Sequence, residues 1–203
     1  MIAIVDYGLG NLKSVKSALD RIGEPSTITS EPGRVASAAG VIFPGVGAFR
    51  RAMQNLEELE LLEPLHHVAD SGRPFLGICL GQQLLLSESS EHGHHHGLDI
   101  IAGRCTRFAG DLKVPHMGWN EVEQARPSPL FEGIPDPSFF YFAHSFYVVP
   151  HDPDVVIGRT DYGGPFAAAV QKGNVFGVQF HPEKSGPTGL AMLANFCRLC
   201  RST

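Results

Sequence analysis

The sequence has few cysteines and no long apolar run. Four cysteines among 203 residues are too few and too unevenly spaced for a disulfide scaffold, so we expect free thiols. No apolar stretch approaches the roughly 20 residues that cross a bilayer, and no basic segment followed by an apolar one precedes the strand-like residues 2–6. We therefore expect a cytoplasmic protein that does not enter the membrane.

Runs of basic residues are also absent. The formal net charge is -5 and charged residues make up 18% of the chain, which argues against nucleic acid as a partner and favours a small-molecule substrate. No shift in composition and no linker divides the sequence. We expect one domain over residues 1–203.

The pattern of apolar residues changes halfway along the chain. Strand-like segments alternate with helical periodicity up to the cysteine at 79, which predicts a mostly parallel sheet with helices on both faces. Short β-rich segments follow, at 100–108, 119–122, 139–142, 146–149, 155–160, 167–171 and 175–180. The predicted fold class is therefore α/β, with an additional antiparallel β region in the C-terminal half.

Cys79 lies between a short apolar strand and a helix-favouring run. Gly77 and Gly81 flank it as G-x-C-x-G, the spacing of the nucleophile elbow with sulfur in place of oxygen. Glycines permit a turn too sharp for side chains, so the thiol would project above the sheet. Taken alone, this pattern also fits a buried structural cysteine beside a tight turn.

A second segment, FGVQFHPE, provides possible partners for the thiol. His181 and Glu183 are two residues apart at the end of an apolar strand, so their side chains project to the same face. The carboxylate could orient the imidazole, and the imidazole could reach the thiol. The hypothesis is therefore Cys79 as nucleophile, His181 as general base and then acid, and Glu183 as the residue that orients it.

Two glycine-containing loops are expected at the same edge of the sheet. The loop DYGLGN has a lysine where a dinucleotide fingerprint needs its third glycine, so no cofactor is predicted. In PGVGAF, the backbone of Gly45, Val46 and Gly47 could act with the N–H of Leu80 as an oxyanion hole. An ordinary Pro-Gly turn is the alternative.

Three other features have simpler explanations or remain open. The histidine-rich segment 91–97 has no regular spacing and is interpreted as a mobile surface loop, so no metal is predicted. Cys197 and Cys200 share a helical face and are expected to pack rather than react. In VPHMGWN, Trp119 could be a core residue or, with Met117, part of a surface for a protein partner.

These motifs together resemble the class I (triad) glutamine amidotransferases. GICLGQQLL and FGVQFHPE carry the resemblance to the family, while DYGLGN, PGVGAF, VPHMGWN and YFAHSFYV resemble its branch of glutaminase subunits of imidazole glycerol phosphate synthase. The resemblance covers nearly the whole chain. Gln82, where a methionine is usual, and the histidine-rich segment depart from the family pattern.

The resemblance implies a three-layer, flavodoxin-like fold and hydrolysis of glutamine to glutamate and ammonia. It implies that glutamine lies near Gly47, Gln83, His144 and Ser145. It also implies a heterodimer with a barrel-fold cyclase subunit, which receives the ammonia for histidine biosynthesis, and we expect Asn11, Met117 and Trp119 at that interface.

Three alternatives remain. The chain could serve another synthase, of the aminodeoxychorismate or anthranilate type, but such a protein should lack PGVGAF and HMGWN. A cysteine hydrolase or chaperone of the same fold should lack His-Pro-Glu. A non-catalytic partner-binding subunit should have a broken triad.

Overall fold

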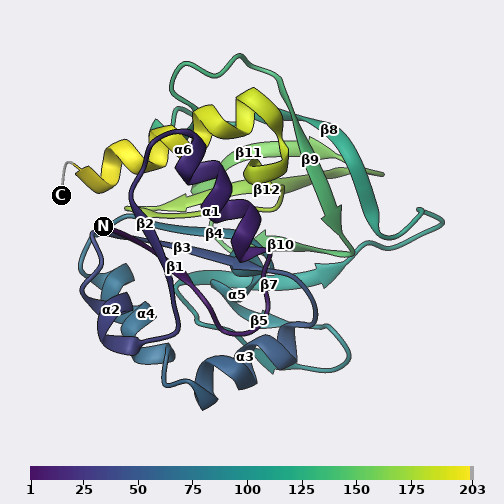
Figure 1. Cartoon of the computed structure of the whole chain (residues 1–203). Coiled ribbons are helices and arrows are strands. Elements are labelled where there is room, and N and C mark those ends of the chain that lie inside the picture. The colour runs from purple at the N-terminus through teal and green to yellow at the C-terminus, as the bar shows by residue number, and fades with distance from the viewer. Residues whose placement is uncertain (202–203) are drawn as a thin grey trace.

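The computed structural model describes residues 1–201 as a mixed sheet between two helical layers (Figure 1). Five parallel strands form one half of the sheet in the order β2-β1-β3-β4-β13. Their bounds are β1 Ile2–Val5, β2 Ser26–Thr29, β3 Gly40–Gly45, β4 Phe75–Cys79 and β13 Val175–Val178. The predicted parallel sheet is therefore present. Residues 202 and 203 of the predicted domain lie outside the described residues.

Six helices cover this half of the sheet. Figure 1 shows α1 and α6 on one face and α2, α3 and α4 on the other. Their bounds are α1 Leu12–Arg21, α2 Pro32–Ala36, α3 Phe49–Glu58, α4 Leu62–Asp70, α5 Leu80–Leu84 and α6 Gly186–Arg201. Within residues 1–201, every helix is too short or too polar to cross a bilayer.

The other half of the sheet is mostly antiparallel, as predicted. It continues from β13 in the order β12-β10-β7-β5-β6, and β11 joins β12 to a separate pair formed by β8 and β9. The bounds are β5 Leu86–Ser89, β6 His95–His96, β7 Ile101–Arg107, β8 His116–Gln124, β9 Ser138–His144, β10 Phe146–Pro150, β11 Val156–Asp161 and β12 Pro165–Lys172. Short 3-10 helices span Pro129–Phe131, Pro153–Val155 and Pro182–Lys184.

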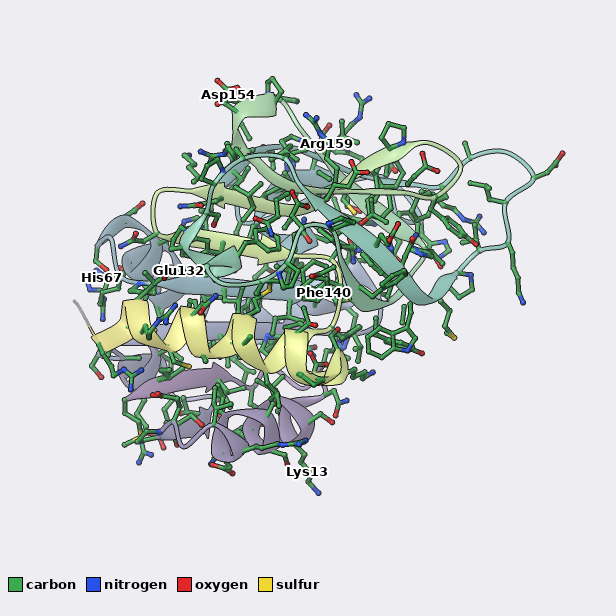
Figure 2. All side chains as sticks on the ribbon, turned by 90° about the horizontal axis from the view of Figure 1, so that it is seen from above. Lys13, His67, Glu132, Phe140, Asp154 and Arg159 are labelled. Carbon is green, nitrogen blue, oxygen red and sulfur yellow. The ribbon has the colours of Figure 1, made fainter. Side chains whose placement is uncertain are left out.

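Alternating side chains of the strands divide the core into two parts. Ile2, Ile4 and Ile42 face the layer of α1 and α6, whereas Val41 and Phe43 face the layer of α2 to α5. This alternation follows from the period of two in a β-strand and explains why both faces need a helical cover. Figure 2 shows that Glu132 and Phe140, from the antiparallel half, also lie beside α6, so this helix covers both halves of the molecule.

Candidate active site

Cys79 is the last residue of β4 and immediately precedes α5. Its backbone has φ 55° and ψ -108°, a conformation that side chains rarely adopt and that is typical of strained functional turns. A Cβ on Gly81 would lie 1.8 Å from the Phe43 carbonyl oxygen, and a Cβ on Gly77 would lie 2.8 Å from the Gly81 backbone. Both flanking positions therefore require glycine, as the motif predicts.

His181 and Glu183 follow β13, the strand that pairs in parallel with β4. The register aligns Val178 with Ile78, so the chain beyond β13 emerges at the edge where Cys79 ends its own strand. The Nδ1 atom of His181 lies 2.8 Å from Oε1 of Glu183, and both side chains are buried. Sheet pairing thus brings the His181 and Glu183 pair to Cys79, which lies about 100 positions earlier in the sequence.

The proton affinity of His181 reflects these neighbours. Burial lowers its pKa, but Cys79 and Glu183, through hydrogen bonding and negative charge, outweigh that effect and raise the pKa to about 9. An imidazole in this setting retains a proton near neutral pH. His181 can therefore supply a proton to a leaving group beside the Cys79 nucleophile.

Gln179 is a further contact of the thiol that the sequence reasoning missed. Its Nε2 lies 3.7 Å from Sγ of Cys79, and the carbonyl oxygen of Ala143 lies 3.9 Å from the same sulfur. Gln179 precedes His181 by two residues, so the spacing that selected Glu183 could also have identified it.

A cavity of about 200 Å³ opens beside the thiol. Its lining comes from the loop after β3, the junction of β4 and α5, the segment after β5, the start of β8, and the β9–β10 connection. The lining residues are Val46, Gly47, Cys79, Leu80, Gln83, Glu91, Pro115, Met117, Ala143, His144, Ser145 and Phe146. All four residues that the resemblance assigns to glutamine are in this lining. Of the four oxyanion candidates, Gly45 alone does not line the cavity, because it is buried behind Val46 against the Tyr7 hydroxyl.

Glu91 also lines the cavity, and no sequence signal pointed to it. Its carboxylate accepts a hydrogen bond of 2.5 Å from the backbone N–H of Phe49, the first residue of α3. A carboxylate at a helix N-terminus is stabilised there by the unpaired N–H groups. Glu91 belongs to the histidine-rich segment, which the sequence assigned to a surface loop without a role.

The histidine-rich segment is only partly a loop. Residues His95 and His96 form strand β6 against β5, and His95 is half-buried, so the prediction of a mobile surface loop was wrong for these two residues. These two histidines adopt a regular strand conformation because they pair with Glu88 and Ser89 of β5. Among residues 1–201, no group of three or more His, Cys, Asp or Glu side chains is arranged to hold a metal ion.

The thiols of Cys197 and Cys200 are buried in the core between α6 and the sheet. Neither forms a disulfide. Burial raises the pKa of each to about 12, which keeps both thiols protonated and unreactive. Their surroundings are consistent with packing.

Of the residues expected at a partner interface, Met117 lines the same cavity, and Trp119 follows it by two positions on β8. Met117 and Trp119, on β8, are 64% and 56% exposed, and Phe139 on the paired strand β9 is 53% exposed. The core interpretation of Trp119 is therefore wrong. Asn11 is the residue before the first turn of α1, at the same edge of the parallel sheet.

Comparison with known proteins identifies close relatives. Residues 3–200 match the family described as glutamine amidotransferase class-I. The chain is 54% identical over 200 residues to the imidazole glycerol phosphate synthase subunit HisH of Moorella thermoacetica, covering 98% of this chain and 95% of the relative. It is 48% identical over 196 residues to the HisH subunit of Aquifex aeolicus, covering 96% of this chain and 95% of that one.

Solved structures with a similar fold are more distant in sequence. A structure of PurLQS from Thermotoga maritima has a TM-score of 0.78 at 18% identity and covers 97% of both chains. The glutaminase domain of CTPS from Trypanosoma brucei has a TM-score of 0.67 at 17% identity, covering 97% of this chain and 93% of the other. At such identities the likeness concerns the fold alone.

Proposed function

The chain belongs to the class-I glutamine amidotransferase family, and we propose that it is the glutaminase subunit of imidazole glycerol phosphate synthase in histidine biosynthesis. One observation carries this proposal: about half of all positions are identical to HisH subunits along nearly the full length of both chains. The Cys79, His181 and Glu183 arrangement is consistent with the chemistry of such a protein.

The reaction begins with attack of the Cys79 sulfur on the side-chain amide carbon of glutamine. The new carbon–sulfur bond converts the carbonyl into a tetrahedral oxyanion. The N–H of Leu80, which follows the sulfur-bearing residue, and the backbone of Gly45, Val46 and Gly47 stabilise that charge. Val46, Gly47 and Leu80 line the cavity beside the sulfur, which supports these assignments.

His181 takes the proton of the Cys79 thiol as the sulfur attacks and then transfers it to the leaving group. Collapse of the intermediate breaks the carbon–nitrogen bond, and the imidazolium protonates the nitrogen, which leaves as ammonia. A water molecule, deprotonated by His181, hydrolyses the γ-glutamyl thioester to glutamate and restores the thiol. Glu183 holds Nδ1 of the ring, so that Nε2 faces the sulfur throughout. These steps require no cofactor.

We assign the binding of glutamine to neutral polar groups and one carboxylate of the cavity. Gln83, His144 and Ser145 line the cavity, as the resemblance implies, and Glu91 adds a carboxylate. We assign Glu91 and Gln83 to the α-ammonium group of glutamine because both can present oxygen acceptors. The backbone near Ser145 is assigned to the α-carboxylate.

The ammonia requires an acceptor close by. In neutral water most of it becomes ammonium, which is not a nucleophile, so the product must pass directly to a second site. A barrel-fold cyclase subunit that forms a heterodimer with this chain would provide it and complete the lyase reaction of the synthase. Met117, which lines the cavity, and the exposed side chains of Trp119 and Phe139 on the same strand pair are suited to such a contact, together with Asn11. A cytoplasmic location stays a prediction from the sequence.

The decisive variant is Cys79→Ala. Without the sulfur no thioester forms, so glutamine hydrolysis in the complex with the cyclase should fall by at least a thousandfold. The same complex should still form product with added ammonium salt, because the cyclase site is intact. Release of glutamate and formation of the cyclised product are measured in parallel.

Cys197→Ala is the matched control, since it also removes a buried thiol but lies on the core-facing side of α6. It should keep the glutaminase rate. Substantial hydrolysis by Cys79→Ala would remove Cys79 from its role, and failure of the wild-type chain to support the cyclase with glutamine would refute the proposed function.

A further inference from the structure

Two buried histidines, His116 and His144, lie side by side at the cavity wall. The proposed reaction and the binding of glutamine give no role to His116. Nδ1 of His116 on β8 is 2.9 Å from Nε2 of His144 on β9. Nδ1 of His144 is 2.8 Å from the carbonyl oxygen of Phe146, and Nε2 of His116 is 3.3 Å from Nδ2 of Asn120. His144 lines the cavity, whereas His116 is separated from it by His144.

The partners at both ends assign every proton in this chain of hydrogen bonds. A carbonyl oxygen can only accept, so Nδ1 of His144 carries the hydrogen and its Nε2 has a free lone pair. His116 must therefore donate from Nδ1, and its Nε2 accepts from the amide of Asn120. That amide also donates to the carbonyl oxygen of Asp161, at 2.9 Å, which fixes its orientation.

Both rings must be neutral for this assignment to hold. Burial lowers the pKa of His116 to about 4. Burial also lowers the pKa of His144, to about 3, and outweighs the hydrogen bond to Phe146. The direction of the hydrogen bonds is thus maintained at every pH at which the protein would work.

The chain of hydrogen bonds continues from Phe146 to the substrate pocket. The same carbonyl oxygen accepts a hydrogen bond of 2.9 Å from Nε2 of Gln83, and this nitrogen donates its second hydrogen to Oε1 of Gln179 at 3.1 Å. Gln179 in turn approaches the Cys79 sulfur. Both hydrogens of the Gln83 amide are therefore used. Within residues 1–201 no hydrogen bond occupies its oxygen, so this oxygen can accept a hydrogen bond from a ligand in the cavity.

We propose that His116 is a positioning residue for glutamine binding. It fixes the tautomer of His144, and His144 and Gln83 both donate to the Phe146 carbonyl oxygen. This shared acceptor keeps the Gln83 side-chain oxygen directed toward the α-ammonium group of the substrate. The inference rests on the proposed function, because it takes glutamine as the ligand of this pocket. A neutral histidine pair fits this task because it carries direction without bringing a charge near the imidazolium of His181.

The test compares two substitutions of His116 in the complex with the cyclase. His116→Leu removes the donor, so the KM for glutamine should rise about tenfold while kcat changes less than threefold, since a lost hydrogen bond is worth about 1.4 kcal/mol. His116→Asn places an amide N–H where Nδ1 lies and should restore KM to within about threefold of wild type.

Tyr162→Leu is the packing control. The Tyr162 ring stacks on His116 with 4.0 Å between centroids but takes no part in the hydrogen-bond chain. Its loss should lower the melting temperature about as much as His116→Leu and leave KM unchanged. If His116 had a purely structural role, His116→Leu and Tyr162→Leu would change KM by the same factor, or neither would change it.

A second readout does not depend on activity. The ¹⁵N shifts of the His144 ring report its tautomer, which should be Nδ1–H in the wild type and in His116→Asn but a mixture in His116→Leu. An Nε2–H tautomer in the wild type would overturn the inference, as would an unchanged KM in His116→Leu. Failure of the wild-type complex to hydrolyse glutamine would instead refute the proposed function, and the ring shifts would still test the histidine pair.

Discussion

At the scale of single residues, Gln82 is the least expected side chain of the interior. It is fully buried on α5, and neither its Oε1 nor its Nε2 has a hydrogen-bond partner among residues 1–201. Its stem packs against Gly177, where a Cβ would lie 2.7 Å from Cγ. Gln83, next to it, uses both amide hydrogens. Two adjacent glutamines therefore have opposite effects on stability, since a buried amide costs free energy unless it is hydrogen-bonded.

The first residue-scale prediction follows from this contrast. Gln82→Met keeps the shape of the side chain and removes the unpaired amide, so it should raise the free energy of unfolding by about 1 to 2 kcal/mol. Gln83→Met is the control and should lower it, because it leaves the Gln179 oxygen without its donor. Urea unfolding of the three chains at pH 7 measures both changes. Loss of stability in Gln82→Met would mean that the amide is satisfied in solution.

The sequence identified some residues of the site better than others. Cys79, His181 and Glu183 could be predicted as neighbours because each belongs to a short motif whose spacing determines where its side chain points. Glu91 and His116 were not, because each acquires its neighbours only through tertiary contacts: α3 for the first, and the pairing of β8 with β9 for the second. No periodicity of a single segment carries that information.

At the scale of elements, the end of β3 is held by the loop that follows β1. A Cβ on Gly45 would lie 2.1 Å from the Tyr7 hydroxyl oxygen and 2.9 Å from Cβ of Leu80. Tyr7 is fully buried, and in the part of the chain that the structure describes its hydroxyl has no hydrogen-bond partner. A Cβ on Gly10 would lie 3.3 Å from the carbonyl oxygen of Pro44, so this loop contacts the segment before Val46 at two points.

A double-mutant cycle tests this contact. Gly45→Ala should lower the free energy of unfolding by about 2 kcal/mol through overpacking. In a Tyr7→Phe background the loss should be smaller by about 1 kcal/mol, because the atom nearest the new methyl group is gone. Gly33→Ala in α2, where nothing lies within 4 Å of the added Cβ, should be neutral or stabilising. Equal losses in both backgrounds would show that Tyr7 is not the obstacle.

The element boundaries show where local patterns are insufficient. Met53, Leu56, Leu59 and Leu62 recur at helical spacing, a pattern that fits one helix. The structure has two, α3 and α4, because Glu60 adopts a positive φ of 56° between them. The predicted run after Cys79 continues for only five residues of α5 before β5 begins. β5 and β6 were missed because their order comes from pairing with β7 and with each other. The other strands of the C-terminal half were predicted, since β-rich segments between turn residues are a local signal.

At the scale of the whole molecule, the site lies where two kinds of sheet meet. The parallel half supplies the sulfur, the histidine and the backbone near Val46, and the antiparallel half supplies the opposite wall with Met117 and His144. A partner that bound Trp119 and Met117 would therefore contact a strand whose residues also line the cavity. The contact between Tyr7 and Gly45 provides a second connection, from the loop that ends at Asn11.

These two connections predict that the isolated chain is a poor glutaminase and that its partner activates it. The chemical motive is that hydrolysis without an acceptor wastes glutamine. The structural reason is that glycines flank Val46 on both sides, and Gly47 has a φ of 104°. Gly45 and Gly47 therefore allow the peptide groups next to Val46 to adopt more than one orientation. A peptide N–H turned away from the oxyanion in the free chain would be turned toward it in the complex, and one such donor is worth roughly a hundred- to a thousandfold in rate.

Glutamate release by the purified chain is measured alone, with the cyclase, and with the cyclase and its ribotide substrate. The rate should rise at each step, mainly in kcat, because the donor acts on the transition state rather than on bound glutamine. Trp119→Ala should raise the cyclase concentration needed for half-maximal activation without changing the basal rate of the free chain, which separates binding from gating. Equal rates under all three conditions would rule out gating by the partner and leave the assignment of Cys79, His181 and Glu183 unaffected.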